Sequence, residues 1–136
     1  MTSLADMLAT LRTRGLAVPA GPRIVAVGWA TVERERSAHE LAPLVFDPAP
    51  DDAALGAFAW RAPLTSSVAV VLLEPSTEGP LAAALARHGE GPVALWVEGP
   101  PPGPAARTAG PFALGGQATL VRPARPWGPF LLYHQA

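Results

Sequence analysis

The chain has 136 residues, of which 49% are hydrophobic, and a formal net charge of −1. This length is enough for a single domain with a buried core. The sequence contains no cysteine, which excludes disulfides, thiolate metal sites and cysteine nucleophiles. All ten basic residues are arginine and they are scattered along the chain, so we expect no nucleic-acid partner.

Apolar segments stay well short of the roughly 20 residues that a membrane-spanning helix needs. The N-terminus lacks the basic region, apolar region and cleavage site of a secretion signal. We therefore expect a cytoplasmic protein with no membrane partner.

The first predicted element is an amphipathic helix that Thr2 or Ser3 caps and that Gly15 ends. Its apolar residues recur at helical spacing: Leu4, Met7, Leu8 and Leu11. Such a helix must pack on the domain or on a partner subunit. We expect residues 1–22 to form this helix and a linker, and residues 23–136 to form one domain.

The next predicted elements are a strand over residues 24–32 and a short charged helix over 33–41 that acts as a solvated lid. Gly28 in the strand suggests close approach of another backbone or a ligand. Residues 44–52 are rich in proline and aspartate, which predicts an exposed turn region. A strand over 53–61 follows, with Phe58 and Trp60 on the same side.

Residues 68–98 contain the most regular pattern of the chain. An apolar run, Val68–Leu73, predicts a strand that Pro75 ends, because proline lacks an amide hydrogen. A helix capped by Ser76 or Thr77 and ended by Gly89 comes next. A second apolar run, Val93–Val97, predicts another strand.

Prolines recur through residues 99–111, which predicts a loop rather than a helix. The last two predicted strands are Gln117–Val121 and Pro129–Gln135. The turn between them places Trp127 near an edge or a mouth of the sheet.

Two short motifs lie on either side of the predicted helix: Leu72-Leu73-Glu74-Pro75 and His88-Gly89-Glu90-Gly91. Their sequences and spacing resemble the joint between the two modules of the vicinal oxygen chelate superfamily. This superfamily includes the glyoxalase, bleomycin-resistance and methylmalonyl-CoA epimerase proteins. The resemblance implies an α+β fold of paired βαβββ-type half-modules, about residues 23–75 and 92–135, in a curved, mostly antiparallel sheet. The N-terminal helix is an addition, and the loop at 99–111 leaves the second module trimmed.

The resemblance also places the family's metal ligands, at Ala26, Val71, Ala94 and Leu132. Alkyl side chains have no lone pair to donate to a metal. We therefore expect no metal site and no cofactor in this chain. The family further implies a homodimer.

Strand alternation extends this concave face to the i±2 neighbours of the four positions. The candidate ligand-binding residues are Ala26, Gly28, Trp60, Val71, Ala94, Trp96, Phe130 and Leu132. Our leading hypothesis is a metal-free protein that binds a small apolar or aromatic molecule in this cup. The alternative is that these side chains fill the cup as core, which leaves a structural or partner-binding remnant without a ligand.

A second hypothesis is a cofactor-independent isomerase or lyase in which His134 is the acid or base and Glu98 orients it. The sequence supports equally well the alternative that His134 is solvent-exposed at a frayed strand end, because it lies two residues from the C-terminus. His88 lies at the carbonyl end of its predicted helix, where we expect a partly protonated imidazole to interact favourably with the helix dipole, and His39 is expected to lie on a charged surface. Four arginines could bind an anionic ligand through bidentate contacts, although a solvent-exposed surface position is the simpler expectation for each: Arg61, Arg107, Arg122 and Arg125.

Overall fold

The computed structural model describes residues 2–103 and 109–136. Over these residues the chain forms three helices and seven strands. In chain order they are α1 (Leu4–Thr13), β1 (Ile24–Ala30), α2 (Arg34–Glu40), β2 (Asp47–Asp52), β3 (Ala57–Pro63), β4 (Ala69–Pro75), α3 (Pro80–His88), β5 (Gly91–Glu98), β6 (Gln117–Leu120) and β7 (Phe130–Gln135). Arg107 and the rest of the predicted loop at 104–108 lie outside the described residues.

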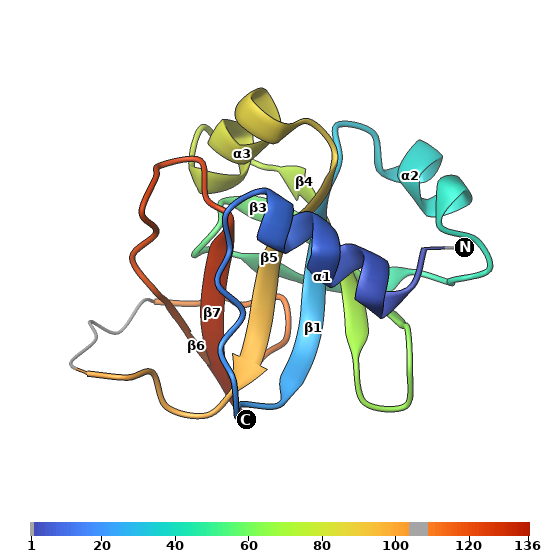
Figure 1. Ribbon diagram of the computed structural model, residues 1–136. Coiled ribbons are helices and arrows are strands. Elements are labelled where there is room, and N and C mark those ends of the chain that lie inside the picture. Colours follow the sequence, from blue (N-terminus) through green and yellow to red (C-terminus); the bar gives the residue numbers. More distant parts are fainter. Residues whose placement is uncertain (1, 104–108) are drawn as a thin grey trace.

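The seven strands form one sheet in the order β2-β3-β4-β1-β5-β7-β6, and the sheet is curled (Figure 1). β1 pairs in parallel with β4, and β5 pairs in parallel with β7. The other neighbours are antiparallel, including the central pair of β1 and β5 that joins the two half-modules. The predicted α+β fold with a mostly antiparallel sheet is confirmed.

The second half-module is shorter than the first. β1 to β4 form four strands with α2 between the first two, whereas β5 to β7 form three. No helix follows β5 in the described residues 99–103 and 109–136. The trimmed second module is therefore also confirmed.

Helix α1 crosses the outer face of the sheet, which we define as the face that carries Val27, Val70 and Leu95 (Figure 1). Its Met7 and Leu11 are 0% exposed and pack against this face. Full burial of such a side chain stabilises a fold by about 1.5–3 kcal/mol. The predicted cap is present, because the Ser3 hydroxyl accepts from the Asp6 N–H while the Asp6 carboxylate accepts from the Ser3 N–H.

The prediction of an exposed turn at 44–52 is wrong over its second half, where Asp47–Asp52 forms the edge strand β2. Pro48 and Pro50 lack an N–H, and a strand can tolerate this at the edge of a sheet, where one side needs no hydrogen-bonding partner. β3 starts at Ala57 rather than at residue 53, because the chain turns at Gly56 with φ +67°. The side chains of β3 point to the predicted sides of the sheet. Ala57 and Ala59 belong to the core on the face opposite to the outer one, which we call the inner face.

The predicted cap of α3 by Ser76 or Thr77 is also wrong. The N-cap residue is Gly79, without a side-chain hydrogen bond, and Pro80 begins the helix. Instead the Leu81 N–H donates to the backbone carbonyl of Leu55, 3.0 Å away, so a loop from the first module satisfies it.

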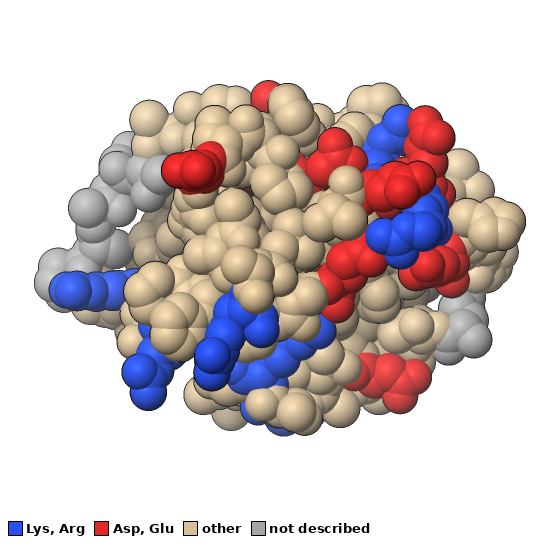
Figure 2. All heavy atoms as spheres, turned by 90° about the horizontal axis from the view of Figure 1, so that it is seen from above, with Lys and Arg blue, Asp and Glu red and all other residues tan. Residues whose placement is uncertain are grey.

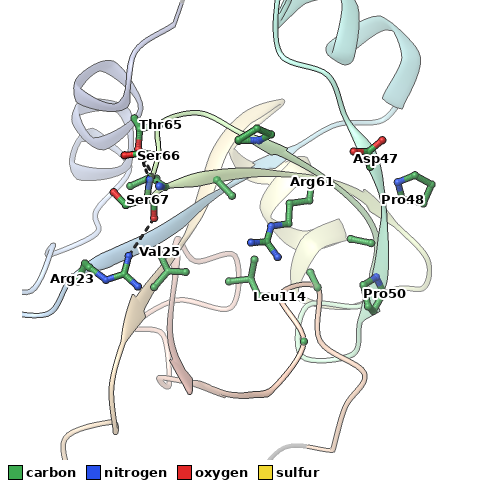
Figure 3. A pocket seen from close by; sticks show the side chains of 16 residues that line it. Arg23, Val25, Asp47, Pro48, Pro50, Arg61, Thr65, Ser66, Ser67 and Leu114 are labelled. Carbon is green, nitrogen blue, oxygen red and sulfur yellow. Dashed lines mark hydrogen bonds between the residues drawn. The ribbon is translucent and has the colours of Figure 1, made fainter. Parts of the chain in front are cut away.

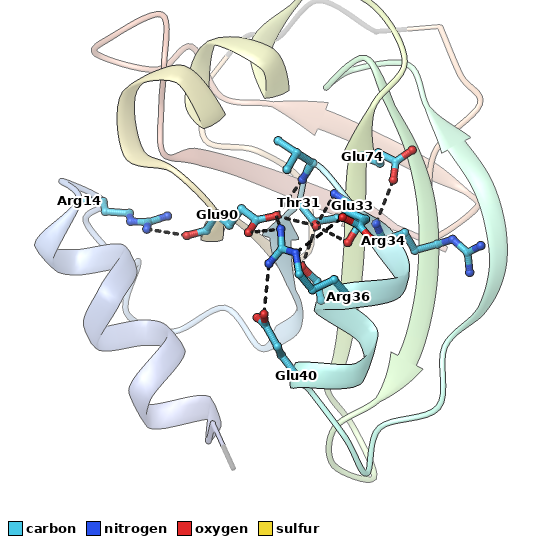
Figure 4. Close-up of polar contacts among 10 residues, drawn as sticks. Arg14, Thr31, Glu33, Arg34, Arg36, Glu40, Glu74 and Glu90 are labelled. Carbon is cyan, nitrogen blue, oxygen red and sulfur yellow. Dashed lines mark hydrogen bonds and ion pairs between the residues drawn. The ribbon is translucent and has the colours of Figure 1, made fainter.

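Two glutamates of the recognised motifs hold α2 in place (Figure 4). Glu90 accepts hydrogen bonds from the Thr31 hydroxyl, the Val32 N–H and the Arg36 guanidinium. Burial disfavours its charged form, but these hydrogen bonds outweigh burial and lower the pKa of Glu90. Glu74 accepts a hydrogen bond from the Arg34 N–H at the start of α2 and so caps this helix.

Candidate functional site

The four positions of the family's metal ligands share the inner face and are completely buried. Ala26, Val71, Ala94 and Leu132 are each 0% exposed and belong to one apolar cluster. Among the described residues, no group of three or more His, Asp or Glu side chains could hold a metal ion. Aliphatic side chains do not fit a divalent metal, so no step of chemistry can be assigned to one here.

Large side chains fill the half of the inner face that lies next to α3. Trp96 is 0% exposed and Phe130 is 1% exposed, and they belong to the same core cluster as Leu55 and Leu81. We call this part the closed half of the cup. The predicted ligand-binding residues in this half are buried, and none of them lines either of the two cavities described below.

Gly28 has a packing role in the closed half. A Cβ atom at this position would lie 2.9 Å from the Trp96 ring and 2.9 Å from the Ala94 side chain. Such distances are too short for carbon atoms, so the missing side chain makes room for the indole ring. The close approach expected from the sequence is made by core side chains of the neighbouring strands.

Asp52 anchors the loop after β5 to the inner face of the sheet. The sequence analysis did not predict this role. Its carboxylate accepts hydrogen bonds from the Leu55 and Ala113 N–H groups, each at 3.1 Å. Burial raises the pKa of Asp52, against the opposing effect of these hydrogen bonds. Phe112 and Ala113, which follow the proline-rich segment, are thereby held in the core. Leu55 lies only 3 residues from Asp52, but the link to the loop has no local signal, since Ala113 lies 61 residues away.

Trp60 lies on the opposite side of β3 from the core residues Ala57 and Ala59, so it does not line the cup. The Arg34 guanidinium stands over its ring, 4.6 Å from the centroid. This contact is a cation–π interaction between α2 and β3.

His134 and Glu98 are direct neighbours in the register of β5 and β7. Glu98, however, forms its ion pair with Arg23 rather than with the histidine. The Nε2 atom of His134 is buried and has no hydrogen-bond partner among the described residues. The expected orientation of His134 by Glu98 therefore has no hydrogen bond to support it.

The other half of the inner face is hollow, and we call it the open half. Here a cavity of about 830 Å³ lies between the starts of β1 and β4, the end of β3 and the beginning of β2. Its apolar walls include Val25, Ala49, Ala69, Leu114 and three prolines. Its polar lining consists of Arg23, Asp47, Arg61, Thr65, Ser66 and Ser67.

The two arginines of the open half differ in their partners. Arg23 is bound by Glu98 and by the backbone carbonyl of Ser67. Arg61 forms no ion pair with a carboxylate of the described chain, and its side chain extends into the cavity toward Leu114 (Figure 3). This is a guanidinium with free donors beside an apolar wall.

Comparison with known proteins gives matches at the level of structure. No family model and no curated protein matches the sequence. A hypothetical protein from Bacillus halodurans is similar with a TM-score of 0.64 and 16% identity, over 85% of this chain and 95% of that one. Methylmalonyl-CoA epimerase from Mycobacterium tuberculosis is similar with a TM-score of 0.64 and 13% identity, over 90% and 93% of the two chains.

The chain has the vicinal oxygen chelate fold. A third similar structure is a variant of methylmalonyl-CoA epimerase from Streptomyces coelicolor in complex with 2-nitronate-propionyl-CoA, with a TM-score of 0.61 and 15% identity over 85% and 99% of the chains. The resemblance predicted from the Glu74 and Glu90 motifs is confirmed at the level of the fold. In this chain Glu74 and Glu90 anchor α2, and the positions where the resemblance places metal ligands are occupied by core side chains.

Proposed function

We propose that this protein binds a small organic acid, with an apolar body and one anionic group, in the open half of the cup. The observation that carries the proposal is the Arg61 guanidinium, which extends into a cavity of about 830 Å³ and has no carboxylate partner among the described residues. Small-molecule sites commonly measure 300–1,000 Å³ and combine apolar walls with a few placed polar groups.

The proposal keeps the predicted metal-free binding function but places the ligand in the open half of the inner face rather than at the positions predicted from the sequence. An aromatic or aliphatic body would contact Val25, Ala69 and Leu114, and its carboxylate would accept two hydrogen bonds from Arg61. The hydroxyls of Thr65 and Ser66 lie in the same lining and can donate to other ligand oxygens.

Structures with the same fold support a small-molecule ligand. One is methylmalonyl-CoA epimerase in complex with methylmalonyl-CoA and ammonium, which matches 85% of this chain at a TM-score of 0.61. At 15% identity this likeness shows the fold alone. The class of ligand proposed for this chain therefore rests on the cavity and on Arg61.

A thermal-shift screen tests the proposal. A panel of aromatic and aliphatic carboxylates, with the matching alcohols and amides, should contain acids that raise the melting temperature of the wild type. Arg61→Gln should abolish the shift, whereas Arg122→Gln, which removes an exposed arginine outside this lining, should preserve it. Equal shifts in the wild type and Arg61→Gln, or equal shifts with acids and alcohols, would refute an anion site at Arg61.

Acid–base catalysis is the second candidate, and the buried, unpartnered Nε2 of His134 is the observation that favours it. In the presence of a carboxylic acid that binds the wild type, His134→Ala should slow proton exchange at the carbon next to the carboxylate, as followed by NMR in deuterated water. Exchange at the wild-type rate would show that His134 is not the acid or base.

A homodimer and a cytoplasmic location remain part of the proposal, and sedimentation at micromolar concentration tests the dimer. Each helix in the described part of the chain falls short of what a bilayer crossing demands in length and apolar character.

A further inference from the structure

Three arginines gather at the end of the sheet opposite to the open half. A pocket of about 690 Å³ lies between the end of α1, the end of α3 and the segment before β7. Its lining includes Arg14, Arg87, Arg125, His88 and Trp127, and contains no carboxylate. Figure 2 looks down on this end of the molecule and shows basic side chains grouped with no acidic ones between them.

Two of these arginines are free to bind a ligand. The guanidinium carbons of Arg87 and Arg125 lie 5.0 and 6.0 Å from the centroid of the Trp127 ring. Neither forms an ion pair within the described part of the chain. The indole ring thus holds both guanidiniums at the pocket, where their in-plane N–H groups remain available.

The third arginine is built into the fold and adds a fixed charge. Arg14 donates to the backbone carbonyls of Pro92, His88 and Glu90, at 2.8, 3.3 and 3.0 Å. It ties α1 to the end of α3. Carbonyl oxygens do not neutralise a cation, so the pocket keeps the charge of three guanidiniums within a concave surface.

His88 adds a further group. Its Nε2 atom is buried and has no hydrogen-bond partner among the described residues. Burial and the nearby Arg14 and Arg87 lower the pKa of His88, which disfavours the protonated imidazole. The predicted role of His88 at the helix end as a partly protonated group is therefore disfavoured by its surroundings.

We propose that this pocket, formed by Arg14, Arg87 and Arg125, is a binding site for a phosphorylated small molecule, separate from the site at Arg61. Phosphate suits it because a dianion can engage two guanidinium forks at once, and arginine binds phosphate through paired hydrogen bonds. A concave pocket admits a free phosphate ester or diphosphate more readily than a flat lipid surface. The ligand also relieves the repulsion between three cations that share one pocket.

Calorimetry with inorganic pyrophosphate at low ionic strength tests this site. The wild type should bind it, and Arg87→Gln and Arg125→Gln should each weaken binding by about tenfold, because each removes charge-assisted hydrogen bonds. Arg122→Gln is the matched control, since it removes an exposed arginine from the same segment but outside the pocket, and it should change binding by no more than about twofold. Arg87 and Arg125 are exposed, so both variants should fold, which circular dichroism verifies.

Two further measurements make the result decisive. Titration with pyrophosphate should shift the NMR signals of the Trp127 indole N–H and the His88 ring, and Arg61→Gln should bind pyrophosphate like the wild type. Equal affinity in the wild type and Arg87→Gln, or an equal loss in Arg122→Gln, would overturn the proposal in favour of non-specific attraction. Capture of the wild type by phosphatidic acid vesicles, unaffected by pyrophosphate, would overturn it in favour of a lipid surface.

Discussion

The closed and open halves of the cup lie on the same sheet face and differ in what packs over them. In the closed half, Trp96, Phe130 and Leu81 pack together from β5, β7 and α3, and each is at most 1% exposed. In the open half, short or polar side chains border a cavity of about 830 Å³. The comparison shows that the four positions where the resemblance places metal ligands belong to the packed core, whereas the cavity lies at the other end of the inner face.

The largest expected effect comes from removing the main side chain of the closed half. Trp96→Ala should destabilise the protein by about 3–5 kcal/mol, because it removes a buried aromatic ring and leaves a cavity. Urea denaturation measures the loss. Phe58→Ala is the control, since Phe58 is 43% exposed and its truncation should cost much less. Similar costs for both variants would mean that the closed half is not packed as a core.

Overpacking tests the same half from the opposite direction. Gly28→Ala should cost about 1–3 kcal/mol, because the added methyl group would lie 2.9 Å from the Trp96 ring. Gly79→Ala is the matched control, since its Cβ would meet its nearest neighbour at an ordinary 3.7 Å. Chemical denaturation that finds Gly28→Ala as stable as the wild type would argue against the tight fit of strand and indole.

Asp52 joins the two halves, because it holds the loop that carries Phe112 into the cup and Leu114 into the cavity wall. Asp52→Ala should cost about 1–3 kcal/mol at neutral pH, since it leaves the buried Leu55 and Ala113 N–H groups without an acceptor. Hydrogen exchange at the Ala113 amide should increase in the variant. Exchange at the wild-type rate would show that this loop has another anchor.

The same variant has a predictable pH dependence. The folded chain raises the pKa of Asp52 above its ordinary value of 3.8, so it binds this proton more tightly than the unfolded chain does. Stability from this group is then fully present below pH 3.8 and declines as the pH rises through the folded pKa. The stability gap between wild type and Asp52→Ala should therefore be wider in acid than at neutral pH. A gap that widens with rising pH would contradict the raised pKa.

The smallest effect on stability is expected in the open half. Arg61→Gln should change the free energy of unfolding by no more than about 0.5 kcal/mol, because Arg61 is exposed and has no ion-pair partner in the described chain. Thermal denaturation without ligand checks this. A large loss would show that Arg61 supports the fold, and its effect on ligand binding could then not be assigned to direct contact.

Local sequence was sufficient for most of the fold because its signals are short-range. The family resemblance placed Ala26, Val71 and Ala94 on one face, strand alternation extended that face to their i±2 neighbours, and the structure confirms the grouping of these three residues. The cap of α1 was likewise readable from neighbouring residues, whereas the contacts of Glu74 and Glu90 with α2 span 40 and 54 residues and were not. The edge strand β2 was missed because proline and aspartate favour turns in isolation, and only its pairing with β3 makes it a strand.

The state of the cup could be decided only by the tertiary structure. Whether the inner face is filled depends on Leu55, Leu81 and Phe112, which reach it from three distant parts of the chain. The same is true of the arginines: sequence marked Arg61 and Arg125 as possible anion clamps, but their surroundings decide which are free. Spacing along the chain determines which way a side chain points, whereas packing between distant segments determines whether the space in front of it is occupied.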